Sequence, residues 1–182
     1  MNIATFGRGA VIVMALLATA CASTRTQKSA GEQIDDTVIT SKVKSALIAD
    51  PITKAHQIDV EVFRGVVQLN GFVDSAANRD QATKVARGVG GVTEVRNNLQ
   101  LQTAPRSASV ATDDAGITSS VKSALIADNR TKAGQINVET RAGVVQLSGF
   151  VNNAEAKTAA GQLASGVANV KRVDNQLDVK TN

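Results

Sequence analysis

The side chains that most often carry enzyme chemistry are scarce in this chain. Among 182 residues there is one cysteine, Cys21, and one histidine, His56, and neither tyrosine nor tryptophan occurs. Zinc is held mainly by Cys and His side chains, and no second Cys or His is present to complete a zinc site. The carboxylates are dispersed along the chain, whereas a calcium site needs several in one loop. We therefore predict a non-enzymatic protein with no catalytic residues, no metal site and no cofactor.

The residues before Cys21 indicate how its thiol is used. Arg8 gives the chain a positive start, and the apolar run 10–20 is too short to span a bilayer as a helix. This pattern predicts a secretory signal peptide over residues 1–20. The stretch "LLATAC" resembles the lipobox of bacterial lipoproteins, whose cysteine carries acyl chains such as palmitate. By that resemblance Cys21 is lipidated, and Ala22 favours sorting to the outer membrane. The alternative is a plain secretory peptide that leaves Cys21 as a free thiol.

Three cations in the second half of the chain form a candidate site for anionic lipid headgroups. Lys122 lies in a predicted helix, and Arg130 and Lys132 lie in the loop that follows it. A Lys or Arg near an anionic membrane surface contributes about 1 kcal/mol to binding. The alternative interpretation is an ordinary solvated surface, and the lack of Trp and Tyr argues against deep insertion into a bilayer.

An internal repeat organises most of the chain. Residues 35–101 align with residues 113–179 without a gap, and 37 of the 67 aligned positions are identical. The phrase "GVVQLNGFV" at 65–73 returns as "GVVQLSGFV" at 143–151. The sequence thus predicts a lipidated cysteine with a flexible tether over 21–34, a first domain over 35–101, a linker over 102–112 and a second domain over 113–182.

The charge of the repeats argues against a nucleic-acid partner. The first repeat has eight Lys or Arg and eight Asp or Glu, and the second has seven of each. The net charge of +4 therefore comes from the leader, tether, linker and tail. A neutral domain that lacks Tyr and Trp is a poor binder of nucleic acid, which is held by cations and by stacking.

Hydrophobic periodicity predicts the same elements in both repeats. A helix is followed by an alternating strand, a tight turn at Gly65 or Gly143, a second strand, a second helix and a last strand. Asp35 or Asp36, like the aspartates at 113 and 114, is expected to cap the first helix. The predicted fold is α+β, with two tandem α-β-β-α-β units, each a small three-stranded sheet with two helices on one face.

The alternation of the second strand also separates the two faces of each sheet. Val67, Leu69 and Val73 are expected to face the helices, and Gly71 to let a helix come close to the strand. Gln68 and Phe72 then lie on the opposite face, where Phe72 and its counterpart Phe150 are available for packing between the domains. The alternative is that each phenylalanine closes the edge of its own core.

The phrase "VVQLNGFV", the Ala-rich helix after it and the stretch "GVTEVRNNLQL" resemble the BON domain. Two copies behind a lipobox resemble the dual-BON outer-membrane lipoproteins, a family associated with the periplasm and with osmotic stress. The resemblance implies a lipid-anchored protein that faces the periplasm of a Gram-negative bacterium. It also implies BON domains that bind anionic phospholipid or envelope proteins and support envelope integrity or stress tolerance. The alternatives are a protein-interaction module whose only lipid contact is its anchor, and a small-molecule or ion sensor.

The anchor yields the first testable prediction. Replacing Cys21 with Ser removes the sulfur that would carry the acyl chains, so Cys21→Ser should release the protein from membranes and abolish labelling by a fatty-acid analogue. Cell fractionation and metabolic labelling measure both effects. Continued labelling of the variant would contradict the lipobox interpretation.

Overall fold

The computed structural model describes residues 30–53, 57–102 and 107–180. The first repeat contains α1 (Ala30–Ala49), β1 (Ile58–Phe63), β2 (Val66–Val73), α2 (Ala76–Arg87), β3 (Glu94–Asn97) and β4 (Gln100–Leu101). The second contains α3 (Ala108–Ala127), the 3-10 helix η2 (Ala133–Gln135), β5 (Asn137–Arg141), β6 (Val144–Val151), α4 (Ala154–Ser165) and β7 (Arg172–Val179). The predicted order and the α+β class are confirmed, except that the last strand of the first repeat is divided into β3 and β4, which gives that sheet four strands rather than three. The predicted signal peptide 1–20, Cys21 and His56 lie outside the described residues.

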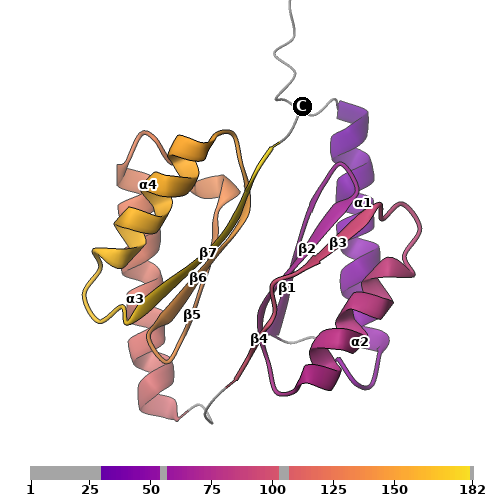
Figure 1. Cartoon of the computed structure of the whole chain (residues 1–182), viewed down its shortest axis with the longest axis horizontal. Coiled ribbons are helices and arrows are strands. Elements are labelled where there is room, and N and C mark those ends of the chain that lie inside the picture. The colour runs from indigo at the N-terminus through magenta and orange to yellow at the C-terminus, as the bar shows by residue number, and fades with distance from the viewer. Residues whose placement is uncertain (1–29, 54–56, 103–106, 181–182) are drawn as a thin grey trace, which may run out of the picture.

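The second strand of each repeat forms the centre of its sheet. β2 pairs antiparallel with β1 and parallel with β3 and β4. β6 lies in the same way between antiparallel β5 and parallel β7. Helices α1 and α2 cover one face of the first sheet, and α3 and α4 cover one face of the second (Figure 1).

Each repeat has a hydrophobic core of its own. Val67, Leu69 and Val73 of β2 pack with residues of α1, α2 and β1, as the alternation predicted. The equivalent residues of β6 belong to a separate cluster that is built only from the second repeat. Because both cores lie between a sheet and its helices, the opposite face of each sheet is left to contact something else.

The first helix of each repeat begins earlier than the sequence predicted. α1 starts at Ala30, inside the expected tether, and α3 starts at Ala108, inside the expected linker. The N-cap of α3 is Ser107, whose side chain accepts a hydrogen bond from the backbone N–H of Val110. The prediction that the aspartates at 35, 36, 113 and 114 cap these helices was therefore wrong.

Asp114 instead holds the hairpin turn of its repeat. Its two carboxylate oxygens accept from the N–H groups of Ala142 and Gly143, at 2.9 and 3.0 Å. Asp36 accepts from the turn of the first repeat in the same way. Both carboxylates are nearly fully buried. A tight turn leaves backbone N–H groups unpaired, and a buried carboxylate satisfies two of them at once.

The two sheets face each other across the middle of the molecule, with the helices outside (Figure 1). The centre of this junction is polar. Gln68 of β2 and Gln146 of β6 occupy equivalent positions in the two repeats, and their side chains are 0% and 1% exposed. A buried amide is costly unless it is hydrogen-bonded, so the partners of these two side chains matter for how the sheets pack.

Both glutamines are hydrogen-bonded across the junction in a reciprocal arrangement. The Gln146 Oε1 atom accepts from the N–H of Gly71 at 2.6 Å, and the Gln68 Oε1 atom accepts from the N–H of Gly149 at 3.0 Å. Gln146 Nε2 donates to the carbonyl of Asn98 at 2.7 Å, and Gln68 Nε2 donates to the equivalent carbonyl of Gln176 at 3.4 Å. The repeats are thus related by an internal two-fold axis, as in an isologous dimer.

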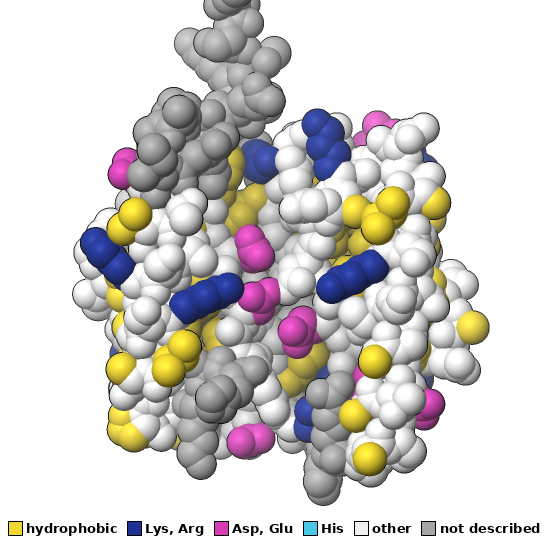
Figure 2. Space-filling view, turned by 180° about the vertical axis from the view of Figure 1, so that it is seen from behind, with side chains coloured by type: hydrophobic (Ala, Val, Ile, Leu, Met, Phe, Trp, Pro, Cys, Tyr) yellow, Lys and Arg dark blue, Asp and Glu magenta, His cyan; other side chains and the backbone are white. Residues whose placement is uncertain are grey.

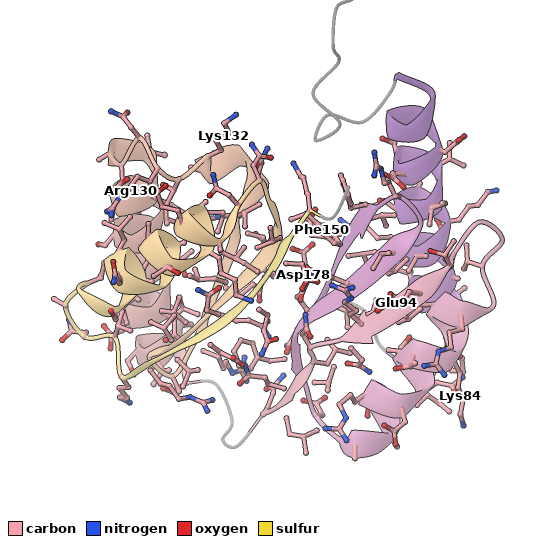
Figure 3. All side chains as sticks on the ribbon, turned by 45° about the horizontal axis from the view of Figure 1, so that its top comes forward. Lys84, Glu94, Arg130, Lys132, Phe150 and Asp178 are labelled. Carbon is pink, nitrogen blue, oxygen red and sulfur yellow. The ribbon has the colours of Figure 1, made fainter. Side chains whose placement is uncertain are left out.

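Aromatic and charged contacts extend the junction outward. The rings of Phe63 and Phe150 lie 5.4 Å apart between centroids, so Phe150 packs between the domains rather than closing its own core. Arg96 of β3 forms an ion pair with Asp178 of β7 at 2.5 Å. Figure 3 shows Phe150 and Asp178 in the space between the two sheets. On the face seen in Figure 2, acidic side chains line the junction, and a cation lies on either side.

Gly71 and Gly149 are required for a reason that the sequence did not indicate. Their φ angles are +111° and +117°. A Cβ on Gly149 would lie 2.3 Å from the carbonyl oxygen of Gln135, and a Cβ on Gly71 would lie 2.2 Å from that of Gln57. The expectation that Gly71 admits a helix is therefore corrected: the close neighbour is the backbone that leads into β1.

We predict that Gly149→Ala lowers the free energy of unfolding by at least about 2 kcal/mol, because the new Cβ meets backbone and the residue is held at positive φ. Gly116→Ala is the matched control, since a Cβ there has no neighbour within 4 Å. That glycine lies inside α3, so the control should raise stability by about 0.5–1 kcal/mol. Urea unfolding of both variants measures the difference, and equal stability would contradict the described strand geometry.

Candidate membrane-facing site

The three predicted cations lie at one end of the second repeat, where α3 ends and the chain turns toward η2. We define the basic end as Lys122, Ile126, Arg130 and Lys132. All four residues are exposed. Arg130 and Lys132 lie toward the same end of the molecule in Figure 3. The predicted residues thus lie on the C-terminal part of α3 and in the segment that connects it to η2.

Ile126 is the residue of this surface that sequence reasoning missed. It is 72% exposed, although burial of its side chain would be favourable. It lies four residues after Lys122 on α3, so the two side chains share a face of the helix. Both line a shallow cavity of about 360 Å³. Ala133 and Gly134, which follow Lys132 in the sequence, line the same cavity. The sequence could have indicated its exposure, because Ile126 does not share the helical spacing of the buried residues Ile117, Val121 and Leu125.

Arg130 differs from the two lysines because its charge already has a partner. Its Nε and Nη2 atoms donate to the two carboxylate oxygens of Asp128, at 3.0 and 2.6 Å. These hydrogen bonds, with one from the backbone N–H of Arg130, lower the pKa of Asp128 to about 2. Among the residues that the structure describes, Lys122 and Lys132 form no ion pair. The lysines therefore supply the positive charge that is available to a ligand.

The equivalent end of the first repeat is more apolar. Ile48 corresponds to Ile126 and is 66% exposed, and Ile52 takes the place of Arg130. Lys44, the counterpart of Lys122, lies 3.6 Å from the carboxylate of Asp59. Lys54, the counterpart of Lys132, lies outside the described residues. The two surfaces thus share an exposed isoleucine, and the first has Ile52 where the second has Arg130.

The internal two-fold axis turns these two ends in opposite directions. α1 begins at the top of Figure 1 and runs downward, whereas α3 begins at the bottom and runs upward. The C-terminal end of α3, with Ile126, therefore lies at the same end of the molecule as Ala30, the first residue of α1. Ala30 is nine residues from Cys21 in the sequence. The first repeat directs Ile48 and Ile52 toward the other end.

Within the described ranges, there is no group of three or more His, Cys, Asp or Glu residues that could hold a metal ion. None of the helices in those ranges combines the length and the apolar character needed to cross a membrane.

Comparison with known proteins gives a consistent result for both repeats. The model of the BON domain family matches residues 35–103 and 113–181. The chain is 40% identical over 151 residues to "Osmotically-inducible protein Y" of Escherichia coli, which covers 82% of this chain and 75% of that protein. It is 35% identical over 147 residues to "Outer membrane lipoprotein DolP" of Haemophilus influenzae, covering 80% and 75%. The "21 kDa hemolysin" of Actinobacillus pleuropneumoniae is 33% identical over 147 residues, with the same coverage.

The pairing of Arg130 yields a prediction about titration. Replacing Arg130 with Ala removes the side-chain hydrogen bonds and the positive charge that favour the ionised carboxylate. The pKa of Asp128 should therefore rise from about 2 toward its ordinary value of 3.8. An NMR titration of the carboxyl carbon measures this shift. An unchanged pKa in the variant would show that Arg130 is not paired with Asp128 in solution, and would return its charge to the candidate site.

Proposed function

Because the chain belongs to the BON domain family, we propose that it is a non-enzymatic outer-membrane lipoprotein, anchored through Cys21 and facing the periplasm, whose second repeat binds anionic phospholipid. Its role would be to support envelope integrity or stress tolerance. The likeness to proteins named as an outer-membrane lipoprotein and as osmotically inducible supports the location and the stress context.

The observation that carries the proposal is the composition of the basic end. Lys122 and Lys132 offer charge to a phosphate group, and Ile126 offers apolar surface to the acyl boundary. Each lysine contributes about 1 kcal/mol at an anionic membrane surface, so the pair alone binds weakly. A lipid anchor at Cys21 compensates for weak affinity, because it holds the site at a high effective concentration beside the bilayer.

The orientation of the repeats supports the same surface. The basic end and the start of α1 lie at one end of the molecule (Figure 1), so a membrane anchor before α1 and a headgroup site on α3 can face a single bilayer. The equivalent surface of the first repeat points away, and its Lys44 already has a partner in Asp59, whereas Lys122 forms no ion pair among the described residues. This difference explains why the second repeat, rather than the first, is the proposed lipid-binding unit.

Vesicle flotation tests the charge requirement. The chain from residue 22 onward should float with vesicles of phosphatidylethanolamine and phosphatidylglycerol, but not with phosphatidylethanolamine and phosphatidylcholine, and binding should fall as NaCl is raised. Lys122→Glu with Lys132→Glu should weaken binding at least about tenfold. Lys84→Glu makes the same kind of change at the exposed end of α2 and should leave binding within about twofold.

An isoleucine pair separates insertion from simple charge attraction. Ile126→Ser should weaken binding to the anionic vesicles, whereas Ile48→Ser, at the equivalent position of the first repeat, should not. If the unsubstituted chain from residue 22 onward does not bind in a salt-sensitive way, or if Lys84→Glu is as harmful as the double variant, the proposal is wrong. The chain would then be better explained as a protein-interaction module of the envelope whose only lipid contact is its anchor.

A further inference from the structure

The residues at the junction between the repeats differ from the core residues in how far they are shared by the two repeats. Most of the core is identical in the two repeats, whereas several residues at the rim of the junction are not. Because the two sheets are related by an internal two-fold axis, each rim residue can be compared with its counterpart 78 positions away. The counterpart is the side chain that would stand at the same contact if a repeat packed against a copy of itself.

Asp59 and Asn137 lie on this axis. They are equivalent residues of β1 and β5, and the Asn137 Nδ2 atom donates to the Asp59 Oδ2 atom across the junction. If a first repeat packed against another first repeat in this geometry, two Asp59 carboxylates would face each other. The asparagine of the second repeat replaces that repulsion with a hydrogen bond.

Arg96 and Asp174 form a second pair of equivalent positions with different chemistry. Arg96 forms its ion pair with Asp178, whereas Asp174 accepts a hydrogen bond from the side-chain amide of Gln100, the counterpart of Asp178. A second repeat packed against another second repeat would place Asp174 opposite Asp178. That pairing again sets two carboxylates against each other, with Arg172, which now donates to Gln100 at 3.2 Å, as the nearby cation, and it lacks the ion pair that Arg96 forms with Asp178.

We infer that the face of each sheet turned away from its helices is a docking surface specific for the unlike repeat, and that Asn137 and Arg96 are the residues that select this partner. The shared glutamines and glycines make the faces self-complementary, which by itself would also allow chains to pair through like repeats. The residues that differ between the repeats at the rim of the junction disfavour this pairing of like repeats. They keep each chain closed on itself even where many copies are crowded together.

Amide hydrogen exchange tests this inference in the full chain, with Cys21→Ser in every variant so that no anchor complicates the comparison. The N–H groups of Gly71 and Gly149 report on the junction directly, because they donate to Gln146 and Gln68 of the other repeat. Asn137→Asp should make both amides exchange at least about tenfold faster, because two carboxylates then meet on the axis. The amide of Val43, inside the first core, should be unaffected.

The exchanged pair provides the decisive control. Asp59→Asn combined with Asn137→Asp restores one carboxylate and one amide at this contact. Lys122, the counterpart of Lys44, is then the lysine beside the new Asp at position 137, as Lys44 is now beside Asp59. This double variant should recover protection of Gly71 and Gly149 to within about threefold of the parent chain. If it is no better protected than Asn137→Asp alone, the inference is wrong.

The second pair gives an independent measurement. Arg96→Asp should accelerate exchange of Gly71 and Gly149 more than Arg96→Gln does, because only the aspartate adds repulsion to the lost ion pair. Equal effects of the two variants would show that Arg96 contributes attraction but does not select the partner. Unchanged exchange in Asn137→Asp would likewise overturn the selection by charge, whatever the state of the rest of the junction.

Discussion

The two buried glutamine amides at the junction are the interaction on which the arrangement of this molecule depends. Gln68 and Gln146 each bind a backbone N–H and a backbone carbonyl of the other repeat. An apolar junction would tolerate sliding of one sheet over the other, but buried amides are satisfied in one register only. The sheets are therefore fixed relative to each other, and the duplicated chain behaves as a dimer of repeats within one polypeptide.

This fixed arrangement makes the two ends of the molecule chemically different. A two-fold axis between identical repeats would give identical ends, and the differences between the repeats break that equivalence. One end combines the start of α1 with the lysines and Ile126 of the second repeat, and the other presents Ile48 and Ile52. A protein anchored before α1 would thus meet a membrane with the end that carries the lysines and Ile126.

The sequence predicted the fold well because the fold depends on local patterns that occur twice. The alternation in β2 placed Val67 and Leu69 in the core and Gln68 on the opposite face. It could not show that Gln68 would be buried, because the partner that buries it comes from the other repeat. The role of Asp36 was mispredicted for a similar reason. The N–H groups that donate to its carboxylate lie in a turn 28 and 29 residues away. The cations of the site were visible in the sequence, but the pairing of Arg130 and the exposure of Ile126 required the structure.

The measurement that tests the packing of the repeats most directly is the nuclear Overhauser effect between the rings of Phe63 and Phe150. These rings come from different repeats, and their centroids lie 5.4 Å apart. The chain has only four phenylalanines and no other aromatic side chain except His56, so selective labelling leaves few signals to assign. The described packing predicts a clear cross-peak between the two rings in the unmodified chain. Its absence, with both repeats folded, would contradict the two-fold junction and the orientation that follows from it.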